Sequence, residues 1–341
     1  MNTMRNIPKP AVVWMPNVEI FMLLVNLTEE GARYQTKAVH PLRRAAWLRF
    51  DPSRRAPAVV ETGRLLREGF WLDAIMELAL AAEVLPKASL AYPLSRDSVQ
   101  RLVRESGNGE QGLSRLNRYL EMAAAFTLDA EPNEFLRAHA EEYRGAVGDL
   151  ENALGEMEWL GTVESYFGTE HRSYLCAASL LMPAGFAFGL SLGTPEGPVA
   201  FHVTGPFIET DASLTFASPE QAAVGAEREF IRAFLKPVIS RGQLSARSFV
   251  DAFERSRASF QSLGYRQPLD CLEDHLVQVI QARLTARRGG KAAADAMLKY
   301  DAEAGYVFSR QLAERLEDYE LHRTDFPAFE KYFPHLMDSF R

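Results

Sequence analysis

The sequence predicts an α+β fold that is mostly helical and contains one small antiparallel sheet. Three observations support this class. Apolar residues recur at helical spacing in most of residues 18–160, strand-like segments follow Gly168, and helical spacing resumes after residue 218. Helices and strands do not alternate along the chain, so a doubly wound sheet is not expected. We therefore expect an N-terminal helical region over 1–160 and a second region over 161–341, packed together as one unit.

The first region indicates a series of helices. Residues 18–28 are almost all apolar and suit a buried helix. Residues 57–83 indicate one or two amphipathic helices, with Gly69 as a break and Pro86 just beyond the end. Further helices, with a turn at residues 107–109 between the first two, are expected over residues 94–106, 111–127 and 132–160.

The second region begins with strand-like segments. Tight turns that contain Gly and Pro separate these segments, which favours an antiparallel meander. The expected strands cover residues 174–181, 186–192 and 199–204.

Helices follow the strands. Ser218 has the character of a helix cap, with Pro219 in the first turn and Gln221 three residues after the cap. Pro237 is expected to end this helix near Lys236. The aromatic-rich tail over 326–334 is expected to pack back on the body, after further helices over residues 245–262, 268–287, 291–300 and 305–319.

Composition limits the class of protein. The hydrophobic fraction of 47% and the charged fraction of 24% are typical of a globular chain. The formal net charge of −7 argues against a nucleic-acid partner, because phosphate binding needs clustered Lys and Arg. We interpret the short basic runs as solvated surface; they are Arg43-Arg44, Arg54-Arg55 and Arg287-Arg288.

The two cysteines and the apolar runs exclude further classes. Two cysteines make neither a disulfide framework nor a cysteine zinc cluster. Cys176 lies in an apolar run that is typical of a core, and a single bridge to Cys271 stays open. No apolar run approaches the length of a membrane span, and the N-terminus has no signal-peptide core. A cytoplasmic location is expected for the chain as given, and a trimmed export signal would leave no trace.

One stretch carries a candidate site. Residues 228–232 spell Arg-Glu-x-x-Arg, the spacing of the H-E-x-x-H helix of zinc peptidases. Residues four apart share a helix face, so Arg228 and Arg232 are neighbours, and Arg228 lies on or beside the stripe of Val224, Ile231 and Leu235. Two arginines at this spacing repel, so an anion is expected beside them. Glu229 points roughly 100° away from Arg228, so a second acid from elsewhere in the chain is expected.

Several segments together resemble a bacterial family of uncharacterised zincin-like metallopeptidases, whose helix is approximately H-E-F-x-H-S-F-x-N-P. The helix here is REFIRAFLKP, residues 228–237, in which the Glu, both Phe and the Pro fall in register. The resemblance covers most of residues 18–337. The other matching segments are FDPSRRAPAVVETGRLLREGFWLDA, SYFGTEHRSYLCAASLLMPAGFAFGLSL, LEDHLVQVIQARL and RLEDYELHRTDFPAFEKYFPHL.

The resemblance implies a site in which the metal ligands are missing. Arg228 and Arg232 stand at the two zinc-ligand histidines of the family, and neither can ligate because a guanidinium has no lone pair to give. Glu229 stands at the general-base position, and Asp274 stands at the acidic third ligand. Zinc is therefore expected in the family and not here. Glu229 and Asp274 are expected to pair with Arg228 or Arg232 across the former pocket.

Three hypotheses follow. The first is a catalytically degenerate zincin-like protein that binds a peptide or an anionic ligand in the former cleft, or regulates a partner. The second is an active hydrolase with a relocated metal site, for which Glu229, Asp274, His202 and His275 are the only ligand set that we can assemble. His202 and His275 are the possible cleft-lining residues. His202 lies in an expected strand, and in zincins the edge strand beside the active helix binds substrate backbone; a packed, hydrogen-bonded His275 is the alternative. The third is a purely structural role. Oligomeric state stays open.

Overall fold

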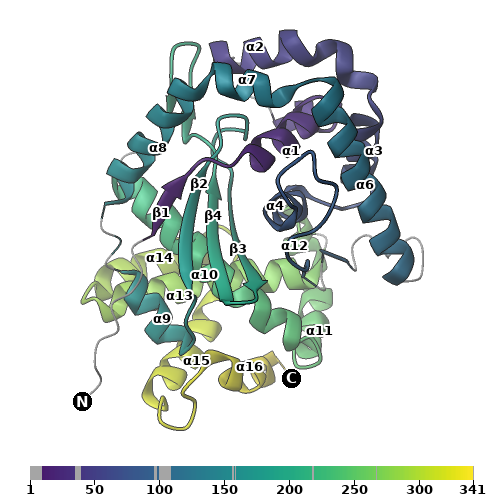
Figure 1. The fold of residues 1–341 in the computed structure, drawn as a ribbon. Coiled ribbons are helices and arrows are strands. Elements are labelled where there is room, and N and C mark those ends of the chain that lie inside the picture. The colour runs from purple at the N-terminus through teal and green to yellow at the C-terminus, as the bar shows by residue number, and fades with distance from the viewer. Residues whose placement is uncertain are drawn as a thin grey trace.

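The computed structural model describes most of the chain, namely residues 10–34, 40–95, 98–99, 109–155, 157, 159–216, 219–265 and 267–340. Helices surround one small sheet in this part of the chain (Figure 1), which confirms the predicted mostly helical α+β class. Most of the expected helix over 94–106, most of the turn over 107–109, and the Ser218 cap lie outside the described residues.

The sheet is mixed rather than antiparallel. β3 and β4 form the predicted antiparallel hairpin, but β2 is parallel to β4 and β1 is parallel to β2. The expected antiparallel meander was wrong for β2. After β2 the chain passes the end of β4, forms β3 at the edge of the sheet, and then turns back into β4. We call residues 179–186, which connect β2 to β3, the crossover. The strand order is β1-β2-β4-β3, with β1 at Ala11–Val13, β2 at Ser173–Ala178, β3 at Ala187–Thr194 and β4 at Gly197–Thr204.

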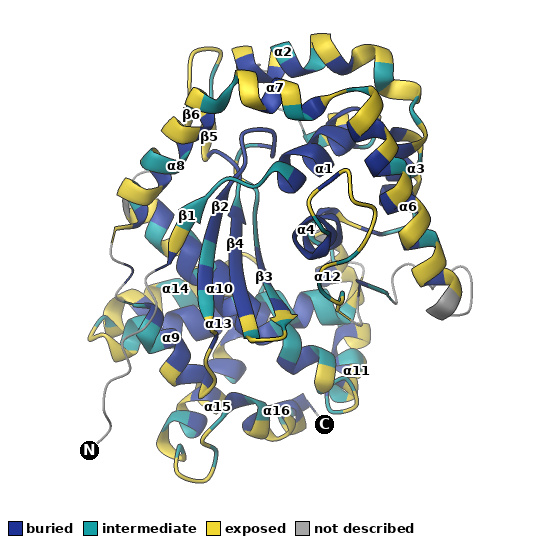
Figure 2. Ribbon diagram, in the orientation of Figure 1, coloured by how far each residue is buried: buried dark blue, intermediate teal, exposed yellow. Residues whose placement is uncertain are grey.

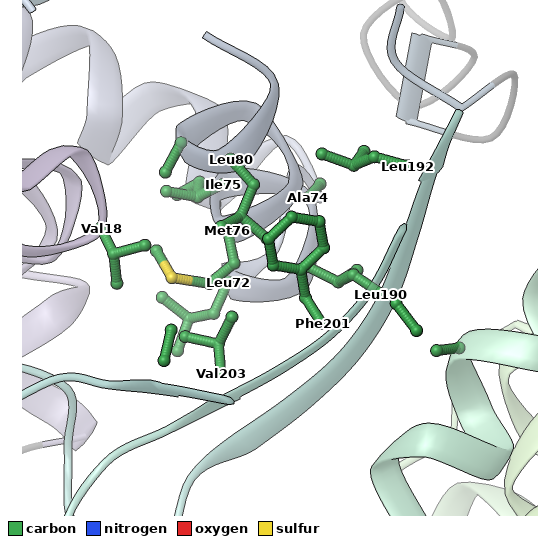
Figure 3. Close-up of a cluster of buried hydrophobic side chains, with 14 of the residues drawn as sticks. Val18, Leu72, Ala74, Ile75, Met76, Leu80, Leu190, Leu192, Phe201 and Val203 are labelled. Atoms are coloured by element: carbon green, nitrogen blue, oxygen red, sulfur yellow. The ribbon is translucent and has the colours of Figure 1, made fainter. Parts of the chain in front are cut away.

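Helices cover both faces of the sheet. Helix α10 (Pro219–Arg241) contacts β3 and β4 on one face, and α8 (Ala140–Leu154) contacts β1 and β2. Helix α4 (Leu72–Ala81) packs on the opposite face, next to α1 (Pro16–Asn26). Because side chains alternate across a strand, the apolar residues that meet α4 in Figure 3 are spaced by two along β3 and β4; they include Leu190, Leu192, Phe201 and Val203.

Most of the remaining helices agree with the expected segments, whereas α2 (Pro41–Phe50) and α9 (Leu160–Phe167) were not predicted. The segment 57–83 divides at Gly69, whose φ of 94° suits glycine, into α3 (Pro57–Arg67) and α4. The other helices are α2 Pro41–Phe50, α6 Gly109–Asp129, α7 Pro132–Ala138, α9 Leu160–Phe167, α11 Arg247–Arg255, α12 Arg257–Ser262, α13 Pro268–Arg287, α14 Lys291–Glu303, α15 Ser309–Leu321 and α16 Phe329–Met337. A second, two-stranded sheet joins β5 (Ile208–Glu209) to β6 (Leu214–Thr215).

Helix α10 continues past the proline that was expected to end it. Pro237 lies inside the helix, which runs to Arg241. A proline removes one backbone hydrogen bond, and a long helix packed along its length tolerates that loss. The expected end near Lys236 was therefore wrong.

Burial follows these layers, as Figure 2 shows for the sheet, α1 and α4. The aromatic tail packs back as predicted, since Phe329, Tyr332 and Phe333 are buried. Cys176 and Cys271 are both buried and free. Among the described residues, no helix is both long enough and apolar enough to span a membrane.

The interpretation of the basic runs holds for five of the six arginines. Arg44, Arg54, Arg55, Arg287 and Arg288 are exposed. Arg43 contradicts it, because its residue exposure is only 7% and its guanidinium contacts backbone carbonyls of the crossover.

Candidate functional site

Helix α10 presents a row of cations to its neighbours. Arg228, Arg232 and Lys236 are spaced by four residues, so they lie on one face of the helix. All three are partly buried, and they face α13, α14 and α4. We call these residues the basic row. Val224, one turn earlier, is 56% exposed, so it does not belong to the apolar stripe that we expected.

Arg232 is the centre of the site. Its Nε contacts Glu229 Oε2 at 3.0 Å, and its Nη1 contacts Glu273 Oε1 at 2.6 Å and Asp274 Oδ1 at 2.8 Å. Glu229 comes from the same helix and the other two acids from α13. The side chains are 8–23% exposed, so these are charge-assisted hydrogen bonds in a largely desolvated setting.

The electrostatics match this geometry. Burial acts to lower the pKa of Arg232, but the three carboxylates outweigh it and hold that pKa well above its usual value. Burial acts to raise the pKa of Asp274, yet Arg232 and a hydrogen bond from Tyr265 bring it below its usual value. Glu273 behaves differently, because burial raises its pKa even though Lys236 and Arg232 oppose this. Arg232 is therefore a permanent cation among three acids.

Two tyrosines complete the far side of Asp274. The Tyr265 hydroxyl donates to Asp274 Oδ2 at 2.6 Å, and it lies 3.2 Å from the Tyr306 hydroxyl. Asp274 is thus bound on one oxygen by Arg232 and on the other by Tyr265. This leaves its carboxylate with little freedom to turn toward another ligand.

We expect Tyr265→Phe to destabilise the chain by about 1.5–3 kcal/mol, the range for hydrogen bonds to charged groups. Tyr306→Phe is the matched control, because its hydroxyl meets Tyr265 rather than the carboxylate, and it should cost about 0.5–1.5 kcal/mol. Urea unfolding measures both variants. Equal losses of unfolding free energy in the two variants would contradict this prediction.

Arg228 has separate partners. The Gln278 amide oxygen accepts hydrogen bonds from Arg228 Nη2 at 2.6 Å and Nη1 at 3.3 Å, in the amide orientation that satisfies both groups. Asp301 of α14 lies near enough for Arg228 to lower its pKa, but burial prevails and raises it. Asp301 Oδ2 has no hydrogen-bond partner among the described residues. Arg228, Gln278 and Asp301 thus form a separate polar group next to Arg232 and its three acids.

Lys236 extends the row toward the N-terminal helices. Its Nζ lies 3.3 Å from Asp73 Oδ2 at the start of α4. The basic row therefore links α10 to α13, α14 and α4 through polar contacts.

Glu229 is buried where a strand and a helix touch. A Cβ built on Gly189 of β3 would lie 1.7 Å from the Glu229 carbonyl oxygen, so only glycine permits this approach. His202 of β4 pairs with Gly189 across the hairpin and is 3% exposed. Burial lowers the pKa of His202 to about 4, against a small opposing effect of Glu229. His202 lies on β4, which is an inner strand, whereas the edge strand next to α10 is β3.

His275 points away from Asp274. It is fully buried, its Nδ1 lies 2.8 Å from the Cys271 carbonyl oxygen, and aromatic rings surround it. Burial lowers the pKa of His275 to about 4. The packed alternative therefore describes this side chain better than the cleft-lining one; the rings are Phe249, Phe260, Tyr306 and Phe308.

The side chains around Arg232 do not fit a zinc ion. The guanidinium itself stands among the three carboxylates and gives a metal no lone pair. No group of three or more His, Cys, Asp or Glu side chains in the described ranges is arranged to hold a metal. The set Glu229, Asp274, His202 and His275 is not brought together in this structure.

Sequence reasoning missed several members of the site. Glu273 directly precedes Asp274, and Lys236 stands where the resembled family has Asn. The charge of each residue was therefore a signal that the sequence offered. Gln278 is uncharged and lies in the same helical segment as Asp274, so no charge marks it in the sequence. Asp301, Tyr265 and Tyr306 gave no local signal, because the packing of α14 and of the loops brings them to α10.

The comparisons with known proteins identify a family and no individual relative. No curated protein and no solved structure shows significant similarity to the chain. A family model described as a domain of unknown function, DUF4932, matches residues 56–339. Because this match covers most of the chain, from α3 to the last residues of the tail, the chain belongs to the DUF4932 family.

Proposed function

We propose that this protein is a catalytically degenerate zincin-like protein, which acts by binding and not by metal-dependent hydrolysis. One observation carries the proposal: the Arg232 guanidinium stands among Glu229, Glu273 and Asp274, and two of these acids occupy the general-base and third-ligand positions implied by the resemblance. A fixed positive charge thus takes the place expected for the metal. The retained Glu229 has no metal-bound water to activate.

The contacts of the basic row bear on where a ligand would bind. Arg232 is bound by three acids, whereas the Gln278 amide is neutral and accepts from two of the five N–H groups of Arg228. In either ligand class expected from the sequence, a peptide or a small anion, a negative group would therefore meet Arg228 rather than Arg232. Regulation of a partner protein would use the same surface.

Restoring the two histidines tests the proposal. We expect Arg228→His with Arg232→His to bind one zinc ion per chain, because two histidines four apart and Asp274 would then supply three ligands. Adding Asp274→Ala should weaken this zinc binding at least tenfold, as for loss of a ligand or its support. Isothermal titration with zinc measures both.

A histidine pair on another helix is the control. Asn117→His with Glu121→His places two histidines four apart on the exposed face of α6, where the residues one turn before and after the pair include no acid, histidine or cysteine. Zinc affinity at α10 no better than at α6 would contradict the zincin relationship. Stoichiometric zinc on the native chain that disappears in Glu229→Ala would contradict the degenerate function and favour the hydrolase.

A further inference from the structure

The crossover is held in place at both ends by backbone hydrogen bonds. The Ser179 amide donates to the Thr204 carbonyl at 2.9 Å, and the Gly185 amide donates to the Pro206 carbonyl at 2.8 Å. Between these points the crossover passes over the end of β4 and has no strand partner of its own. The backbone groups at its centre, residues 180–182, therefore need side chains as partners.

Side chains from α1 and α2 supply these bonds. Arg43 donates to the Leu180 carbonyl at 2.9 Å and to the Met182 carbonyl, and Asn26 donates to the Leu181 carbonyl at 2.8 Å. In the other direction, the Leu181 amide donates to Glu19 Oε2 at 3.1 Å. Residues of α1 and α2, which are far away in sequence, thus bind both carbonyl and amide groups at the centre of the crossover.

Glu19 is the unusual member of this set. It is completely buried, and its Oε2 also accepts a hydrogen bond from Tyr143 of α8 at 2.7 Å. Its Oε1 has no hydrogen-bond partner within the described residues, although the Ser179 hydroxyl lies close by. A buried carboxylate with one unsatisfied oxygen is costly, whereas the protonated acid needs only an acceptor for its O–H.

Arg43 stands between two acids. Its Nη1 contacts Glu209 Oε2 of β5 at 2.8 Å, and both side chains are less than a tenth exposed. Glu19 is the second acid that acts on Arg43. Among the described residues, the charged or titratable groups that act on Glu19 are Arg43 of α2 and Tyr143 of α8; Glu209 and His40 act through Arg43, and Glu142 acts through Tyr143.

We propose that Glu19, Arg43 and Glu209 form a proton-linked clamp on the crossover. While Glu19 is protonated, Arg43 stays on Glu209 and on the carbonyls of Leu180 and Met182. When Glu19 ionises, it competes with these acceptors for Arg43, and the crossover loosens ahead of β3. Since β3 carries Gly189 against Glu229, this clamp acts on the strand that packs on α10. The proposal does not depend on the function proposed above.

The expected pH range follows from linkage. Burial raises the pKa of Glu19 from 4.5 to about 7, against the opposing hydrogen bonds and Arg43. Because the folded pKa lies above the unfolded one, the stabilisation is complete below the unfolded pKa and is lost as pH rises toward the folded pKa. Opening of the crossover should therefore become easier as pH rises, by at most about tenfold per pH unit, and should level off above about pH 7.

Hydrogen exchange of the full chain tests this proposal. We expect peptides that span 179–192 to lose protection between pH 5 and pH 7, after correction for the intrinsic exchange rate. Glu19→Gln should abolish this pH dependence, because its amide keeps the shape without a titration. Glu164→Gln is the matched control: it changes a buried acid that accepts from Tyr174 at the start of β2, the end away from the crossover, and the pH dependence should remain.

A second variant keeps the test decisive if Glu19→Gln does not fold. Tyr143→Phe removes a hydrogen bond that lowers the pKa of Glu19, so the plateau of exchange should move to higher pH. Protection of 179–192 that is independent of pH in the native chain would overturn the proposal. So would an unchanged profile in Glu19→Gln, or an unmoved plateau in Tyr143→Phe.

Discussion

Arg232→Met is expected to destabilise the fold by about 3–5 kcal/mol, the range for removing one partner of a buried ion pair. The variant leaves Glu229, Glu273 and Asp274 without the guanidinium that all three contact. Glu273 and Asp274 would then repel each other in a setting that is largely shielded from water. Chemical unfolding in urea, with midpoint and slope both fitted, measures the loss.

Arg241→Met on the same helix is the control. Arg241 makes a two-point contact with Glu330, but its side chain is 58% exposed, so the loss should be about 0–1 kcal/mol. Adding Asp274→Asn to Arg232→Met should recover at least about 1 kcal/mol, because residues in contact couple by 0.5–3 kcal/mol. A loss below that of Arg241→Met would show that Arg232 does not hold the acids together.

Gly189→Ala is expected to cost about 3 kcal/mol or more, at or beyond the upper end for an overpacked core site. The added Cβ would lie 1.7 Å from the Glu229 carbonyl oxygen, which is a backbone atom and cannot move without the helix. Either β3 or α10 must therefore move, which also displaces Arg232 from its acids. Thermal unfolding followed by circular dichroism measures the effect.

Gly193→Ala is the matched control on the same strand. A Cβ at Gly193 meets no atom within 4 Å, and the residue is exposed, so its stability should change by no more than about 0.5 kcal/mol. If both variants unfolded at the same temperature, the close approach of β3 to α10 would be in error.

Local patterns predicted the helices and the charged face of α10. The four-residue spacing of Arg228 and Arg232 placed both on one face, and the charge on that face required acids from elsewhere. Which arginine receives the acids could not be predicted, because it depends on where α13 crosses α10. Asp274 meets Arg232, while Arg228 lies one turn away and meets Gln278.

The errors share a physical cause, which is contact between distant segments. The direction of β2 depends on β4, which follows β2 and β3 in the sequence but lies between them in the sheet. Arg43 stands next to another arginine, Arg44, which favours a solvated position, but the carbonyls that Arg43 binds lie 137 and 139 residues away. β1 is only three residues long and has no partner nearby in sequence. Periodicity within a short window contains none of this information.

The strand order also has a consequence for the sequence of folding events. The β3–β4 hairpin closes through a two-residue turn, so its entropic cost is small, whereas β1 must find β2 across more than 160 residues, Ala11 opposite Leu175. Parallel pairing of β2 needs β4 already in position beside β3. The hairpin is therefore the natural nucleus of the sheet, β2 docks on its β4 side, and β1 closes the far edge last.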